Sequence, residues 1–155
     1  MKHILLLTIL LVLSPASRAC DFIIGSWQSD AAATMAFNRA KAKLEPRQDE
    51  FLASLMGKMT MEFTPKDMHL KMPDTQVSIG GKPRPFGGFE ERNTYRVLFC
   101  NARMVAIAAR ESATGEEEVW TYFFSGPDAM WTYTGTNRPN IPDLHAREYF
   151  RRIKR

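Results

Sequence analysis

The sequence predicts a mainly β fold: an antiparallel up-and-down barrel of eight or nine strands, with a helical hairpin inserted between the first and second strands. Three observations predict it. Apolar and polar residues alternate with a period of two along most of the chain after Gly57. The links between these segments are mostly short, and no strand–helix alternation typical of a parallel sheet is present. A meander of this many strands either closes or leaves two open edges, so we expect closure.

The N-terminal segment, Met1–Ala19, is predicted to be a secretory signal peptide. The run Ile4–Leu13 is apolar except for one threonine, and Ser17 and Ala19 place small residues where a signal peptidase cuts. An apolar run of about ten residues is far shorter than the ~20 that a membrane-spanning helix needs. We therefore expect export to the periplasm or the medium, no integral membrane segment after cleavage, and one domain over residues 20–155.

The two cysteines, Cys20 and Cys100, are predicted to form a disulfide, because export leads to an oxidising compartment. A bridge that closes a loop of about 80 residues stabilises a fold by roughly 4 kcal/mol in the chain-entropy account. Lipidation of Cys20 is the alternative, since a lipoprotein signal also ends before a cysteine. Ser17 and Arg18 do not fit the residue types that lipidation normally requires at those positions.

The first elements of the domain are a strand and two helices. The β-branched and aromatic run Phe22–Trp27 predicts a strand. Ser29 and Asp30 then favour a helix start, and the insert spans about residues 30–57, with a new helix opening at Pro46 and a cap at Gly57. The expected apolar face of the first helix is Ala33, Phe37, Ala40 and Leu44, and that of the second is Phe51, Leu52, Leu55 and Met56.

The rest of the chain is predicted to be strands joined by turns. Residues 80–88 are so rich in glycine and proline that we expect a loop there, either an ordinary long hairpin loop or a mobile flap with Phe86 at its tip. The predicted strands are 59–63, 68–72, 75–79, 90–99, 104–110, 119–124, 130–134 and 148–153.

A search for chemistry finds no catalytic constellation. Ser125 lacks the glycine spacing of a nucleophile elbow, and His145 is a lone histidine in a loop. Two cysteines with His69 and His145 do not have the spacing of a metal site, so we expect no metal and no cofactor. Lys2 and Arg18 leave with the signal, so 21 basic residues fall to 19 against 17 acidic, which predicts no nucleic-acid binding.

Methionine and other large apolar side chains recur on the alternating strands. Methionine is flexible and polarizable, which suits an adaptable apolar pocket, although it also simply fills cores. If a pocket exists, the residues expected to line the barrel interior or its mouth are Met59, Met61, Phe63, Met68, Leu70, Phe86, Met104, Trp120 and Met130.

The first mature strand carries Gly25-Ser26-Trp27, which resembles the Gly-x-Trp signature of the lipocalins and the wider calycin group. That resemblance implies an eight-stranded antiparallel barrel, with the tryptophan closing one end and a basic residue of the last strand stacked on it. Here Arg151 and Arg152 are the candidates for this stack. Lipocalins usually carry their helix late, whereas this chain places a helical hairpin early, where it would cap or fill the barrel mouth.

We therefore expect an exported, non-enzymatic, lipocalin-like protein that binds a small apolar or amphipathic ligand. The alternative is a protein-binding role, as a periplasmic inhibitor or immunity protein acting against a toxin or a cell-wall enzyme. Small exported barrels with one disulfide suit that role, and the loops would then carry the contacts.

Overall fold

The structure is a computed structural model, and it describes residues 16–110, 115–134 and 145–154. The predicted signal run Ile4–Leu13 therefore lies outside the described residues. The elements are η1 (a 3-10 helix, Ala16–Ile23), β1 (Gly25–Ser29), α1 (Ala31–Lys41), α2 (Pro46–Leu55), β2 (Thr60–Phe63), β3 (Asp67–Met72), β4 (Thr75–Ile79), β5 (Lys82–Phe86), β6 (Phe89–Asn101), β7 (Met104–Arg110), β8 (Glu117–Gly126), β9 (Ala129–Tyr133) and β10 (Arg147–Lys154).

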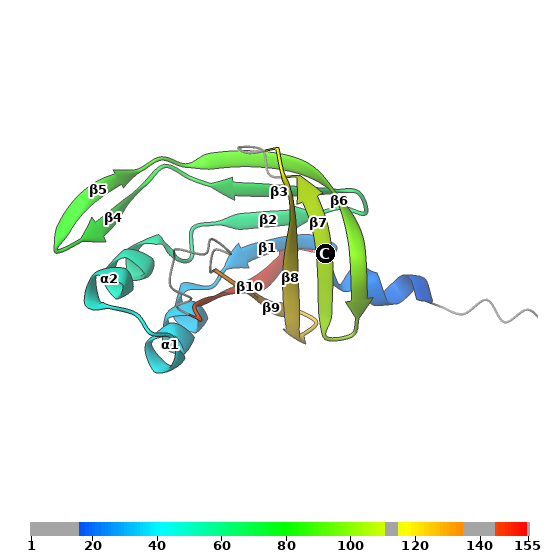
Figure 1. Ribbon diagram of the computed structural model, residues 1–155, viewed down its shortest axis with the longest axis horizontal. Helices are drawn as coiled ribbons and strands as arrows, with labels where there is room; N and C mark the ends of the chain where they lie inside the picture. Colours follow the sequence, from blue (N-terminus) through cyan, green and yellow to red (C-terminus); the bar gives the residue numbers. More distant parts are fainter. Residues whose placement is uncertain (1–15, 111–114, 135–144, 155) are drawn as a thin grey trace, which may run out of the picture.

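Eight strands close into an antiparallel barrel in the order β1-β10-β9-β8-β7-β6-β3-β2 (Figure 1). Strands β4 and β5 form a separate two-stranded ribbon, which is why β3 pairs with β6. The predicted fold class is confirmed: the protein is mainly β, the barrel is closed, and both helices lie between β1 and β2.

The barrel has two distinct ends (Figure 1). The helices and the β4–β5 ribbon lie at one end, where β1 finishes at Ser29 and β10 begins at Arg147; we call this end the mouth. The 3-10 helix η1 lies at the opposite end, which we call the base. A disulfide between Cys20 and Cys100, with Cα atoms 5.5 Å apart, ties η1 to the end of β6 and confirms the predicted pairing.

The prediction that the first strand begins at Phe22 is wrong, because residues up to Ile23 form the 3-10 helix η1. Side chains bind the backbone carbonyls here in place of a neighbouring strand. The Trp27 Nε1 donates to Ile23 O at 2.8 Å, and Arg152 donates to Ile24 O and Phe22 O, both at 2.5 Å. Gly25 then turns the chain into β1 with φ of 124°, a conformation that favours glycine.

The predicted apolar face of the first helix is also wrong. Asp30 caps α1 as expected, accepting from Ala33 N at 3.0 Å, but the buried residues of the helix are Thr34, Met35 and Asn38. Asn38 bonds both backbone groups of Arg147, and Thr34 Oγ1 accepts from Tyr149 N, each at 2.9 Å. Because β1 ends opposite Phe150, these polar side chains replace the missing strand along the start of β10.

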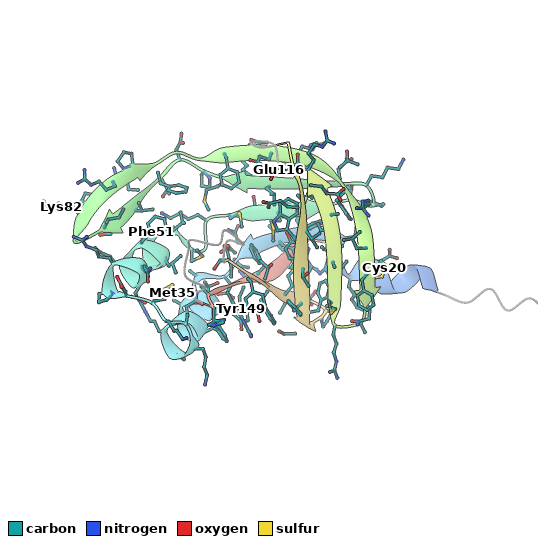
Figure 2. The ribbon with its side chains drawn as sticks, viewed as in Figure 1. Cys20, Met35, Phe51, Lys82, Glu116 and Tyr149 are labelled. Atoms are coloured by element: carbon teal, nitrogen blue, oxygen red, sulfur yellow. A yellow bond between two sulfur atoms is a disulfide. The ribbon has the colours of Figure 1, made fainter. Side chains whose placement is uncertain are left out.

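Residues 80–88 were expected to form a loop, and this prediction is wrong because Lys82–Phe86 form strand β5. Pro83 and Pro85 lie two residues apart, so both nitrogens point to the same side of the strand. That side faces away from β4, where no backbone donor is needed. Phe51 of α2, labelled in Figure 2, packs on Phe86 with ring centroids 6.3 Å apart.

Candidate functional site in the mouth half of the barrel

The base half of the barrel interior is filled by apolar side chains. Strand register and alternation place one residue in two on the inner wall. The buried residues of the interior form one cluster, which extends from Ile23 and Trp27 at the base and also contains Phe63, Met68, Val105, Ile107, Tyr122, Met130 and Phe150. A region packed in this way contributes stability and offers no space to a ligand.

Arg152 closes the base by stacking on Trp27. Its guanidinium carbon lies 4.1 Å from the indole ring centre, and its Nε donates to Pro127 O at 3.0 Å. Together with its bonds to Ile24 and Phe22, the side chain joins η1, β1 and the β8–β9 turn. Arg151, the other candidate from the sequence, is exposed on the outer wall.

The mouth half of the interior has a different composition. By register, Leu70, Trp120 and Thr132 point inward there, yet they are half-buried rather than buried. Asn93 and Glu91 share the inner wall of β6 and are also half-buried. Water therefore reaches inward-facing side chains in this half, and the wall that it reaches is both apolar and polar.

The mouth half also contains a buried carboxyl, that of Glu148, the second residue of β10. Ser29 Oγ donates to Glu148 Oε1 at 2.6 Å and accepts from Gly57 N at 2.9 Å. Glu148 is only 6 % exposed, and Ser29 is its one hydrogen-bond partner among the residues that the structure describes. One face of the carboxyl is thus fixed by β1, while its second oxygen is left available to another donor.

Burial sets the protonation of this group. It raises the pKa of Glu148 to about 7 from 4.5, and the hydrogen bond from Ser29 opposes part of that rise. Burial, and after it the negative charge of Glu148, raises the pKa of the Tyr122 hydroxyl, which stays protonated. Near neutral pH the carboxyl is therefore close to the midpoint of its titration, and it is able to donate or accept a hydrogen bond.

The structure brings most of the predicted lining residues together. Met61, Phe63, Met68 and Met130 belong to the buried cluster, while Met59, Leu70 and Trp120 pack against it from the mouth side. Two lie elsewhere. Met104 pairs with Phe123 on the outward face of β7, and Phe86 packs with Leu55, Met72 and Val77 under the ribbon.

The polar members of the site were missed by the sequence reasoning, although a signal existed. Phe150 is two residues from Glu148, so period two places the glutamate on the same inward face. A carboxylate at a core position is the informative exception to the apolar pattern. Ser29 has the same relation to Trp27.

The chemical groups considered from the sequence are dispersed. Ser125 is exposed near the end of β8, and His145 is exposed with φ of 54° just before β10. No group of three or more His, Cys, Asp or Glu side chains is placed to hold a metal ion within the described ranges.

Comparisons with protein-family models, with curated proteins and with solved structures find no match for this chain. In the part of the chain that the structure describes, no helix has the length and apolar character needed to cross a membrane.

Proposed function

We propose that this protein is an exported, non-enzymatic, lipocalin-like binder that takes a small amphipathic ligand into the mouth half of its barrel. One observation carries the proposal: the interior is packed at the base but half-exposed at the mouth, where the buried carboxyl of Glu148 has Ser29 as its one hydrogen-bond partner among the described residues. The apolar part of the ligand would contact Met59, Leu70 and Trp120. Its polar group would donate a hydrogen bond to Glu148.

Two further features support the lipocalin-like and exported parts of the proposal. The Gly25-Ser26-Trp27 segment has its tryptophan fully buried beneath a stacked Arg152, the arrangement that the resemblance implies. A disulfide that links Cys20 to Cys100 is the form that cysteines take in oxidising compartments. The non-reduced mass of protein purified from its own host tests cleavage before Cys20 and distinguishes the disulfide from lipidation.

The binding test uses three probes with the same tail: octylamine, octanol and octanoate. Glu148 pairs with an ammonium group, accepts from a hydroxyl and repels a carboxylate, so we expect affinity to fall in that order at pH 8. Isothermal titration calorimetry gives the affinities, and the fluorescence of the half-buried Trp120 reports entry into the barrel.

The matched variants are Glu148→Gln and Glu90→Gln. The first retains an acceptor for Ser29 but removes the charge, so octylamine should lose its advantage over octanol. The second removes a carboxylate from the outer wall, where Glu90 pairs with His69 and Lys71, and should change neither affinity. The proposal would be contradicted if the probes bound the folded protein no more tightly than the unfolded chain. It would also be contradicted if Glu148→Gln left the order of the three affinities unchanged.

A further inference from the structure

The outer wall of the barrel carries a stack of four flat groups that the interior site does not use. Phe123 of β8 stacks on Trp131 of β9, with ring centroids 4.2 Å apart and planes at 14°. The guanidinium of Arg147 lies 3.8 Å from the Trp131 ring centre and 4.2 Å from that of Phe37 in α1. Tyr133 stands perpendicular to Trp131 and is half exposed.

Among the residues that the structure describes, none is a counter-ion for Arg147 in this stack. Its buried Nε has no hydrogen-bond acceptor among the residues that the structure describes, and none of their carboxylates pairs with it. The side chain of Asn38 bonds both the backbone N–H and the backbone carbonyl of Arg147, so the backbone is fixed as well as the stacked guanidinium. A fixed guanidinium with free donors is prepared for a carboxylate, because its donors form a planar fork that matches two oxygens.

The charged residues on the outward faces of β9 and β10 are all basic. The outward residues of β9 and β10 are Ala129, Trp131, Tyr133, Arg147, Tyr149, Arg151 and Ile153, and these positions include no acidic residue. Arg151 is exposed, and no carboxylate of the described residues pairs with it. Arg147 and Arg151 are four residues apart on one strand face, which separates them by about 13 Å.

The stack also restricts what kind of molecule fits. Phe123 and Arg147 both lie about 4 Å from the Trp131 ring centre, so they must cover its opposite faces. A nucleobase or a sugar ring docks on an open aromatic face, and Trp131 has none. An extended acidic peptide needs only the guanidinium donors and apolar contact, and Tyr, Trp and Arg are the residue types that dominate protein–protein contacts.

We propose that the outer wall of β8–β10 binds an extended acidic segment of a partner protein, with Arg147 and Arg151 each taking one carboxylate. Two acidic side chains four residues apart on an extended strand would match the arginine spacing. This site lies on the opposite face of β10 from Glu148 and does not depend on the proposed interior ligand.

The test uses two synthetic nonapeptides of otherwise identical sequence, one with glutamate and one with glutamine at positions 3 and 7. NMR follows the Arg147 Nε–H and the Trp131 indole N–H of the full-length mature protein. We expect the glutamate peptide to shift both signals and to bind about tenfold more tightly than its glutamine counterpart at low salt. Equal binding of the two peptides, or shifts confined to other walls, overturns the proposal.

Three variants sharpen the result. Arg147→Gln should reduce the tenfold preference for the glutamate peptide to about threefold, because Arg151 still pairs with the second glutamate. Arg151→Gln, at an exposed position that leaves the stack intact, should weaken binding of the glutamate peptide about threefold and leave octylamine binding unchanged. Arg92→Gln removes the same charge from an exposed site on β6, across the barrel from β10, and should change nothing.

An acidic oligosaccharide such as tetragalacturonate serves as the competing ligand class. If it shifts the Arg147 signal while the glutamate peptide does not, the surface belongs to a glycan and the peptide assignment is wrong. Loss of peptide binding in Arg92→Gln to the same degree as in Arg151→Gln would reveal a response to net charge alone, and it would equally overturn the proposal.

Discussion

The barrel interior holds a buried carboxyl, that of Glu148, which stays protonated at pH values well above those at which a glutamate usually ionises. Replacing Glu148 with glutamine tests this property. The side chain is buried, and its pKa is raised from 4.5 to about 7. A raised pKa means that the folded protein keeps a proton that the unfolded chain releases. Stability from this group is therefore fully present below the unfolded pKa and is lost as pH rises through 7.

The magnitude follows from the shift in pKa. At about 1.36 kcal/mol per unit, the full effect is about 3 kcal/mol, and most of it falls between pH 5 and pH 8. Glutamine does not titrate and still accepts the hydrogen bond from Ser29. Relative to wild type, we therefore expect Glu148→Gln to be about 2–3 kcal/mol more stable at pH 8 than at pH 5, or roughly 8 °C in melting temperature.

The assay is urea unfolding followed by tryptophan fluorescence at pH 5, 6, 7 and 8. Taking the difference between variant and wild type cancels the other groups that titrate in this range. Glu90→Gln is the control, since Glu90 is exposed and its pKa is lowered, chiefly by the hydrogen bond from His69. Parallel pH dependences for wild type and Glu148→Gln would refute the reasoning, because they would mean that the carboxyl does not change its protonation in this range.

Three further predictions concern the architecture. Asn38→Ala leaves both backbone groups of Arg147 without their partner, so the free energy of unfolding should fall by about 2–3 kcal/mol in urea titrations. Gly88→Ala would place a Cβ in collision with the backbone oxygen of Met72 and should cost about 1–3 kcal/mol in the same titrations, whereas a Cβ at Gly87 meets nothing within 4 Å, so Gly87→Ala should be neutral. Equal effects of the two variants would contradict the ribbon's placement. Cys100→Ser should lower stability by about 4 kcal/mol under oxidising conditions and by nothing when compared with reduced wild type.

The strands of the barrel could be predicted because the inner face of each strand is buried and the outer face is exposed to water. The fold then requires apolar and polar residues to alternate, as Met59, Met61 and Phe63 alternate with threonine and glutamate. The predicted strand 104–110 matches β7 from end to end. The failures occur where tertiary contacts replace local ones. Thr34 and Asn38 are buried in α1 only because β10 has unpaired backbone groups beside them, and nothing local to the helix records that.

The candidate site was predictable in its apolar part alone. Met59, Leu70 and Trp120 follow from the pattern of large apolar residues, since any inward position near the mouth favours them. Ser29 and Glu148 were overlooked because a short polar residue after Trp27 and an acid before Phe150 look like ordinary strand ends in the sequence. Their meaning depends on the register between β1 and β10, which places Ser29 against Phe150 and brings two residues 119 positions apart within 2.6 Å.

The helical insert connects the two proposed sites. Arg147 and Glu148 are consecutive on β10 and therefore point to opposite faces of the barrel. Asn38 of α1 holds the backbone of the first, and Ser29, directly before the α1 cap at Asp30, holds the carboxyl of the second. Without the insert, the start of β10 would lose its hydrogen-bond partners on one edge, and neither side chain would have a fixed position. The insert therefore positions the outer arginine directly, through Asn38, and the interior carboxyl indirectly, because Gly57 at its end donates to the Ser29 hydroxyl that holds Glu148.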